Sequence, residues 1–199
     1  MDNRLSYDKI ADKWSDFRNK CVTNKCVEEF AELLPCGARV LDVGCGTGYP
    51  IDRYLTDKGF EVVGIDVSEG MLSHARALCL DKADFIKCDF LDYHSEENFD
   101  AIIALDSLWH VPLSDQEKLY EKASSLLKTG GFLMFTHGKD RGEVENPMFG
   151  ETFCYAALGL DELLSALCRN GFEIVRLEKD YKEKTTGTRE LLVFAKKTS

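Results

Sequence analysis

The sequence predicts an α/β fold built on a doubly wound, seven-stranded sheet that is mostly parallel and ends in an antiparallel hairpin. Short β-branched runs alternate with segments of helical periodicity over most of the chain. A glycine-rich turn directly follows the first of these runs, at residues 44–48. The last two runs follow one another without a helix between them, which is typical of a hairpin.

Five short apolar runs are predicted to be parallel strands, because turn residues flank each of them. They are residues 38–44, 60–66, 83–89, 99–106 and 131–137. Alternation of strands and helices builds right-handed βαβ units. Helices should therefore cover both faces of the sheet.

Helical spacing of apolar residues predicts the connecting helices at about 48–58, 68–81 and 113–128. Ser68 and Ser114 are the expected N-caps, and Ser114 opens a capping-box pattern with Glu117.

Both ends of the chain depart from this alternation. A helix at about 160–170 leads into two long β-rich runs, 172–181 and 188–197, which the turn sequence EKTTG joins as a terminal hairpin. Two amphipathic helices are expected within residues 1–35, ahead of the first strand. Residues 138–158 fit neither pattern and are predicted to form a loop or lid.

The composition favours one globular domain over residues 1–199, because no Pro-, Gly- or Ser-rich linker interrupts the chain. Residues 1–35 would be its helical cap. No apolar run reaches the roughly 18 residues of a membrane helix, and the first residues do not resemble a signal peptide. A cytoplasmic protein without a membrane partner is therefore expected.

The formal net charge is −10, which argues against a nucleic-acid partner, since such proteins need cations to replace phosphate counterions. A small-molecule ligand fits better, and the chain is expected to be a monomer or homodimer. Eight cysteines are present without CxxC spacing, so no metal site is predicted. We expect reduced, mostly buried thiols, with Cys21 and Cys26 the most exposed.

The glycine turn carries the strongest functional signal. Gly44, Gly46 and Gly48 follow the first strand, and glycines let a backbone turn sharply and approach a ligand closely. The helix that follows would offer unpaired N–H groups to an anion. Asp66 ends the second strand, where a carboxylate can accept hydrogen bonds from ribose hydroxyls. Together these features predict a cofactor that contains an adenine nucleoside.

The spacing of the glycines distinguishes between cofactors. A dinucleotide fingerprint needs a third glycine in GxGxxG, but Tyr49 occupies that position. The sequence VLDVGCGTG at 40–48 instead resembles motif I of the class I, Rossmann-like methyltransferases that use S-adenosylmethionine (SAM). The chain resembles the members that act on small molecules. The resemblance continues through VVGIDVSEGML (62–72), FIKCDFLD (85–92), FDAIIALDSLWHVP (99–112) and LLKTGGFLMF (126–135), where Thr129 replaces the usual proline.

The resemblance implies a cofactor site for SAM, or for its product S-adenosylhomocysteine (SAH). The loop would hold the methionine end, Asp66 the ribose, Asp89 the adenine amino group, and Phe90 the adenine ring. The implied cofactor-binding residues are Asp42, Gly44, Cys45, Gly46, Gly48, Asp66, Val67, Met71, Asp89, Phe90 and Ala104.

Methyl transfer from a sulfonium needs mainly alignment, so no catalytic signature is required. His110 follows the fourth strand and is a candidate base, although histidine at this place is often structural. His137 closes the fifth strand, where it could face the methyl site or simply end the strand. Tyr155 lies in the 138–158 segment, the usual side for substrate contacts. Trp109 could pack or stack on a substrate.

Two further segments are candidates for the acceptor side. Glu143, Glu145 and Glu151 could give the pocket an acidic wall that suits an amine, or could be solvated. The segment YDKIADKW (7–14) resembles one that many small-molecule methyltransferases fold over SAM, with Tyr7 and Trp14 closing the pocket. It could equally be an amphipathic helix packed on the sheet.

These observations predict a SAM-dependent methyltransferase acting on a small molecule. The alternatives are a catalytically silent SAM-binding or scaffolding protein and, less favoured, an NAD-dependent oxidoreductase. The acceptor, its nucleophilic atom and the need for a general base stay open at this point.

Overall fold

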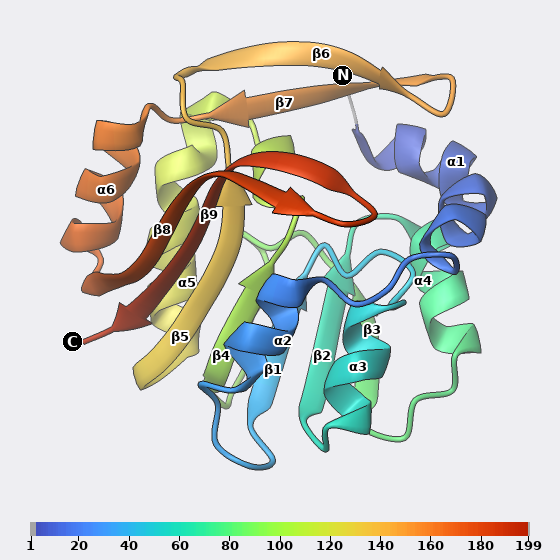
Figure 1. Cartoon of the computed structure of the whole chain (residues 1–199), viewed down its shortest axis with the longest axis horizontal. Coiled ribbons are helices and arrows are strands. Elements are labelled where there is room, and N and C mark those ends of the chain that lie inside the picture. The colour runs from blue at the N-terminus through green and yellow to red at the C-terminus, as the bar shows by residue number, and fades with distance from the viewer. Residues whose placement is uncertain (1–2, 199) are drawn as a thin grey trace.

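A seven-stranded sheet forms the centre of the molecule in the computed structural model, which describes residues 3–198 (Figure 1). The strand order is β3-β2-β1-β4-β5-β9-β8. The first five in this order are parallel, and β9 pairs antiparallel with both β5 and β8. The predicted fold class is therefore confirmed. The strands are β1 (Arg39–Val43), β2 (Glu61–Asp66), β3 (Ala83–Lys87), β4 (Phe99–Ala104), β5 (Leu127–His137), β8 (Phe172–Glu183) and β9 (Gly187–Lys197).

Helices connect β1 to β2, β2 to β3 and β4 to β5, as the periodicity predicts, and two helices precede β1, whereas residues 88–98 join β3 to β4 without a helix. The helices are α1 (Asn3–Arg18), α2 (Lys25–Ala31), α3 (Ile51–Asp57), α4 (Glu69–Ala77), α5 (Gln116–Leu126) and α6 (Leu160–Arg169), with short 3-10 turns η1 (Leu108–His110) and η2 (Leu113–Asp115) before α5. Ser68 caps α4 as predicted, because its hydroxyl accepts the Met71 N–H at 3.1 Å.

The two faces of the sheet are covered by different helices because neighbouring side chains on a strand point to opposite sides. Val40 and Ile103 pack with Phe30 of α2 and Leu55 of α3 on one face. On the other face, strand residues such as Leu41 and Ile102 pack with α5 and α6. Burial on both faces explains why the central strands have nearly continuous apolar runs.

A separate antiparallel hairpin, β6 (Gly142–Met148) and β7 (Glu151–Ala157), occupies most of the segment that was predicted to be a loop. That prediction is wrong for its secondary structure. The first strand is almost entirely exposed, so its sequence shows no alternation of apolar and polar residues that would indicate a strand. Figure 1 shows this hairpin crossing the same end of the sheet as α1.

The hairpin and α1 contact each other to form a roof over the carboxyl ends of the parallel strands. Ile10 of α1 and Phe153 of β7 are buried in one apolar cluster with Met71 of α4. The Ser6 hydroxyl also donates to the Thr152 carbonyl at 2.9 Å. Residues 3–18 thus cover the sheet edge, and the first part of the expected helical cap is present.

Two smaller predictions are wrong. Ser114 does not cap α5, because residues 113–115 form the turn η2 and the helix begins at Gln116. Cys21 and Cys26 are buried, with exposed fractions of 5% and 0%. Cys21 lies in the α1–α2 connection, and Cys26 lies in α2, where its N–H donates to the Tyr181 hydroxyl at 3.1 Å.

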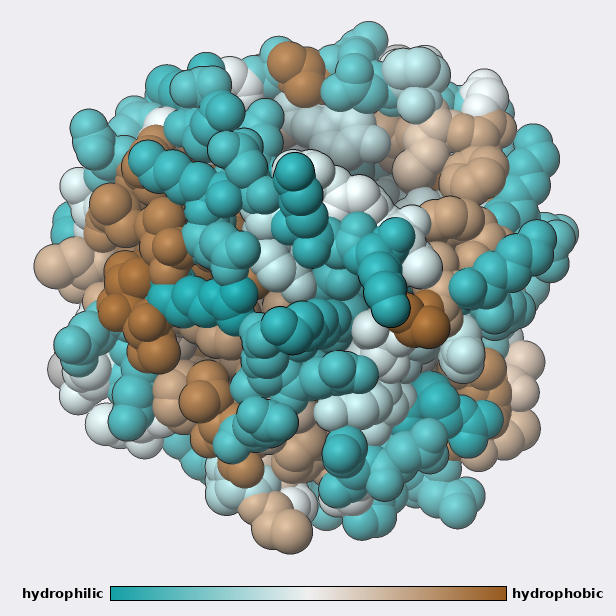
Figure 2. Space-filling view, in the orientation of Figure 1, coloured by the Kyte–Doolittle hydropathy of each residue, from teal (hydrophilic) through white to brown (hydrophobic). Residues whose placement is uncertain are grey.

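The face shown in Figure 2 is mostly hydrophilic, with hydrophobic residues gathered toward α6 and β8. Among residues 3–198, none of the helices combines the length and the apolar character needed to cross a bilayer.

Candidate active site

A cavity of about 1130 Å³ lies between the carboxyl ends of the parallel strands and the roof. Ligands of open α/β sheets bind at this edge, where the strand order reverses. The loops after β1, β2 and β4 form its floor, and α1, the β6–β7 hairpin and the β8–β9 turn complete its walls. The cavity is large enough for a nucleoside cofactor and a second small molecule together.

The glycine loop after β1 is pressed against the loop after β4. Gly44 has φ +74° and Gly46 has φ +58°, a region that side chains of L-residues rarely adopt. A Cβ atom on Gly44 would lie 2.4 Å from the Cβ of Ser107. Glycine is therefore needed at position 44 for both its backbone conformation and the close contact.

The N–H groups of this loop are already used inside the protein. Gly44 and Cys45 donate to the Ile65 carbonyl at 2.8 and 3.1 Å, and Gly46 donates to the Asp66 carboxylate at 2.9 Å. Any N–H groups for an anion would therefore have to come from the helix that follows, as the sequence analysis expected, and not from these three positions of the turn. The helix that follows, α3, begins only at Ile51.

The Asp66 carboxylate is held at the cavity wall by two backbone donors. Its Oδ2 accepts the Gly46 N–H, and its Oδ1 accepts the Ser68 N–H at 2.8 Å. Burial raises the pKa of Asp66 to about 6. At neutral pH the side chain is therefore an oriented carboxylate with lone pairs left to accept further hydrogen bonds.

A second pair of carboxyl groups lies beneath the loop. Asp42 lines the cavity, and Asp52 of α3 is fully buried beside it. Burial raises the pKa of Asp42 to about 6, and burial together with the neighbouring Asp42 raises the pKa of Asp52. Like charges this close cannot both ionise easily, so the pair retains a proton near neutral pH.

Three buried polar atoms of cavity residues have no hydrogen-bond partner within residues 3–198: Thr47 Oγ1, Ser107 Oγ and Trp109 Nε1. Buried polar groups without partners are uncommon in proteins. These atoms fit a polar ligand that would supply the missing partners.

Most of the residues predicted to bind cofactor line the cavity. They are Asp42, Gly44, Cys45, Gly46, Asp66, Val67, Met71, Asp89 and Phe90. Gly48 and Ala104 are not among the lining residues. A Cβ on Gly48 would meet Phe85 at 3.1 Å and Leu78 at 3.2 Å, so this glycine allows close packing. Ala104 is fully buried in the core.

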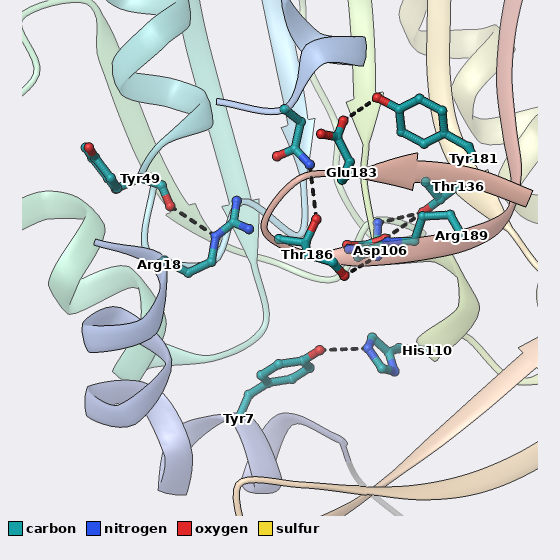
Figure 3. Close-up of polar contacts among 11 residues, drawn as sticks. Tyr7, Arg18, Tyr49, Asp106, His110, Thr136, Tyr181, Glu183, Thr186 and Arg189 are labelled. Carbon is teal, nitrogen blue, oxygen red and sulfur yellow. Dashed lines mark hydrogen bonds and ion pairs between the residues drawn. The ribbon is translucent and has the colours of Figure 1, made fainter. Parts of the chain in front are cut away.

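His110 lies in the cavity and contacts the roof with both ring nitrogens. Its Nε2 is 2.7 Å from the Tyr7 hydroxyl (Figure 3). Its Nδ1 is 2.8 Å from the Asn3 amide nitrogen and 3.0 Å from the Cys154 carbonyl. Burial lowers the pKa of His110 and raises that of Tyr7. At neutral pH the pair is therefore an uncharged imidazole beside a protonated phenol.

The other two candidate catalytic residues differ in position. Tyr155 of β7 lines the cavity, and its ring lies 4.9 Å from the His110 ring. His137 is fully buried, is not a lining residue, and places its Nδ1 2.5 Å from the Gly138 carbonyl. Of the two interpretations of His137, the structure contradicts the one at the methyl site and supports the one at the strand end.

Asp106, after β4, is fixed by groups that the sequence did not reveal. Arg189 of β9 donates to both of its carboxylate oxygens, and Thr136 Oγ1 donates to Oδ1 at 3.1 Å (Figure 3). These contacts hold Asp106 at φ +58°. Only 12% of the Arg189 side chain is exposed.

Of the two interpretations of the hairpin glutamates, the structure contradicts the acidic wall, because none of the three lines the cavity. Glu143 accepts the Leu113 N–H at 3.1 Å, Glu145 lies 3.5 Å from the Cys154 thiol, and Glu151 pairs with a lysine of α1. Glu143 and Glu145 lie on the face of the hairpin opposite to that of Tyr155. Glu151 shares the face of Tyr155 but lies at the turn of the hairpin, where the lysine of α1 binds it. Asn3, Arg18 and Arg189 are cavity residues that the sequence analysis missed.

Comparison with known proteins places these motifs in one family. The family model described as "Methyltransferase domain" matches residues 40–131. Phosphoethanolamine N-methyltransferase 2 of Caenorhabditis elegans is 30% identical over 77% of this chain and 36% of that enzyme. A ubiquinone biosynthesis O-methyltransferase of Alkalilimnicola ehrlichii is 30% identical over 81% of this chain and 66% of its own length. The chain thus spans between about one third and two thirds of these relatives.

Solved structures show the same fold. A SAM-dependent methyltransferase from Clostridium acetobutylicum superimposes with a TM-score of 0.72 at 19% identity, over 98% of this chain and all of that one. A protein from Listeria monocytogenes, described as a putative methyltransferase of the same kind, gives 0.73 at 18% identity, over 86% and 96% of the two chains.

Replacement of Gly44 by alanine should destabilise the protein more than the same change at Gly37. Gly37 has a similar φ of +70° but open space around its Cβ position, so Gly37→Ala should cost only the backbone strain, about 1–2 kcal/mol. Gly44→Ala adds the overlap with Ser107, about 1–3 kcal/mol more. Urea unfolding of both variants measures the difference, and equal losses would show that the Ser107 contact adapts freely.

Proposed function

The chain belongs to the class I SAM-dependent methyltransferases, and on that basis we propose that it binds SAM and methylates a small-molecule acceptor. The observation that carries the proposal is the Asp66 carboxylate, oriented by the Gly46 and Ser68 N–H groups beside the glycine turn. The names of the relatives refer to small compounds, namely phosphoethanolamine and, through its biosynthesis, ubiquinone. The whole activity is a proposal, since those enzymes are longer than this chain.

In this proposal the nucleoside and the methionine end of the cofactor bind to different loops of the cavity floor. Asp66 accepts hydrogen bonds from the ribose, and Asp89 and Phe90 receive the adenine. The turn at Gly44 and Gly46, with Asp42 beneath it, receives the methionine end. Bound SAM would supply an electrophilic methyl group on a sulfonium.

The protein's contribution to transfer is alignment and exclusion of water. The roof of α1 and the β6–β7 hairpin closes over the carboxyl ends of the strands, and its aromatic side chains shield the reacting groups. Tyr7 lies against Phe153, with ring centroids 4.7 Å apart. The acceptor would therefore lie between the glycine turn and the roof, next to Asp106 and His110.

We propose that the Tyr7–His110 pair removes the proton that the acceptor loses on methylation. In one tautomer Nδ1–H donates to the Cys154 carbonyl, and Nε2 then accepts the Tyr7 proton. In the other, Asn3 donates to Nδ1, and Nε2–H donates to the phenol oxygen. The first arrangement lets Tyr7 take a proton from the acceptor as its own proton passes to His110. Because the pKa of His110 is lowered, the imidazole is neutral and able to accept that proton at neutral pH.

Asp66→Ala should weaken SAM and SAH binding by at least about tenfold, which is about 1.4 kcal/mol. The ribose hydroxyls would lose their acceptor in this variant. Isothermal titration calorimetry measures both affinities, with Asp57→Ala, an exposed change at the end of α3, as the matched control. Tight NAD binding without SAM binding would establish the oxidoreductase alternative. SAM binding without turnover across a broad metabolite panel would favour the silent binding protein.

The affinity for SAH should also fall as the pH drops through about 6. The raised pKa of Asp66 means that its carboxylate is ionised above this pH and neutral below it, and a neutral carboxyl is the poorer acceptor. At pH 5 only about one tenth of such a group is ionised, so affinity should fall up to about tenfold relative to pH 7.5. Asp66→Asn should flatten this dependence, and an unchanged slope in that variant would assign the effect to other groups.

Tyr7→Phe and His110→Gln should each lower kcat by about 100-fold, the usual contribution of a positioned proton-transfer group. SAH affinity should stay within threefold. The rate is measured as SAH formation with an acceptor identified in the metabolite panel. Tyr54→Phe and His94→Gln, which lie outside the cavity lining, are the matched controls. If kcat is unchanged in both active-site variants, Tyr7 and His110 do not transfer the proton and have a structural role only.

A further inference from the structure

Four aromatic side chains form a continuous wall where the roof meets the loop after β4. Tyr7, Trp109, His110 and Tyr155 all line the cavity. The centre of the His110 ring is 5.3 Å from that of Tyr7 and 4.9 Å from that of Tyr155. The Trp109 ring lies 6.0 Å beyond Tyr155. These rings are inclined to one another by 46° to 81° and do not stack. A flat aromatic ligand can therefore pack against them at the distances that aromatic pairs prefer.

Asp106, the acidic residue beside this wall, already has a partner, because Arg189 binds both of its carboxylate oxygens. Burial lowers the pKa of His110, so its imidazole is uncharged at neutral pH. The wall therefore recognises a ligand mainly through aromatic rings and hydroxyl groups rather than through a net charge.

The Tyr155 hydroxyl is available to a ligand. It forms no hydrogen bond with any of residues 3–198, whereas the Tyr7 hydroxyl is 2.7 Å from His110 Nε2 (Figure 3). Burial, together with the nearby Asp106, raises the pKa of Tyr155. The phenol is therefore protonated at neutral pH and can donate a hydrogen bond.

The backbone beside Tyr155 is fixed from two sides. The Cys154 N–H donates to the Asn3 side chain at 2.9 Å. The Cys154 carbonyl accepts the Asn3 amide at 2.7 Å and is 3.0 Å from His110 Nδ1. Phe153, on the same face of β7 as Tyr155, is fully buried in the cluster with α1. A side chain held by such contacts can hold a ligand in a fixed position.

We propose that Tyr155 selects an aromatic acceptor that carries a second oxygen atom close to the hydroxyl group to be methylated. Tyr7 and His110 remove the proton of that hydroxyl, and the second oxygen accepts a hydrogen bond from Tyr155 while the ring packs against the wall. Both tyrosines lie against the same imidazole, so two oxygens one or two ring carbons apart can reach them together. This assignment rests on the proposed function, because it concerns the acceptor of that reaction.

The test compares four probes that share one aromatic ring. Catechol and resorcinol carry two hydroxyl groups on adjacent and on alternate carbons, phenol carries one, and toluene carries none. The better of the two diols should bind the wild-type protein about three- to tenfold more tightly than phenol, as one added hydrogen bond predicts. Tyr155→Phe should bring the diol and phenol within about twofold of each other and leave toluene unchanged. Ligand-observed NMR with the full chain measures these affinities with and without SAH.

Two further variants separate the hydroxyl from the ring. Tyr155→Leu removes both and should weaken all four probes by at least about threefold, because the contact with the ring is lost. Tyr54→Phe removes a hydroxyl outside the cavity lining and should change none of the affinities.

A preference for the diol that is the same in the wild-type protein and in Tyr155→Phe would overturn the proposal, and so would a wild-type protein without that preference. Tyr155→Phe keeps the ring and loses only an unbonded hydroxyl, so it decides the question even if Tyr155→Leu unfolds. A wild-type protein that fails to bind SAH would contradict the proposed function. The probe affinities in the ligand-free protein would still show whether Tyr155 binds the second oxygen.

Discussion

The carboxylate of Asp66 joins the parts of the molecule on which the cavity depends. One oxygen holds the N–H of Gly46 in the glycine turn, and the other holds the N–H of Ser68 at the start of α4. Ser68 in turn donates to Asp8 of α1 at 2.6 Å, and Asp8 also accepts the Gly70 N–H at 3.0 Å. A single chain of hydrogen bonds therefore connects the floor of the cavity to its roof. The group assigned to the ribose is also a group that fixes the geometry around it.

A close contact between the loops after β1 and β4 is a second constraint on the shape of the cavity. Gly44 and Ser107 approach so closely that no side chain fits between them. This contact sets how far the glycine turn lies from Asp106 and His110, and so fixes the distance between the two halves of the cavity. Adjacent β1 and β4 are hydrogen-bonded in register, which makes that distance a property of the sheet rather than of flexible loops.

Sequence patterns predicted the floor well because its determinants are local. The strands are short β-branched runs, and Asp66 and the glycines lie at fixed distances from them along the chain. The roof was predicted poorly because its contacts join distant segments. His110 meets Asn3, which is 107 positions away, and Asp106 meets Arg189, which is 83 positions away. No local pattern signals such pairs. The hairpin at 142–157 was missed for a related reason, since an exposed strand carries no apolar alternation.

This division between floor and roof has a chemical consequence. The residues assigned to the donor come from consecutive strand ends, so a change in one of them disturbs the sheet. The residues near the acceptor come from α1, η1, the β6–β7 hairpin and β9, which contact one another mainly through side chains. The negative charge of Asp106 is balanced within this group of residues, because Asp106 binds Arg189. It is therefore not available to attract an amine. The three hairpin glutamates also lie outside the cavity lining among residues 3–198. The acidic wall for an amine, which the glutamate-rich sequence suggested, is therefore not built at this end of the cavity.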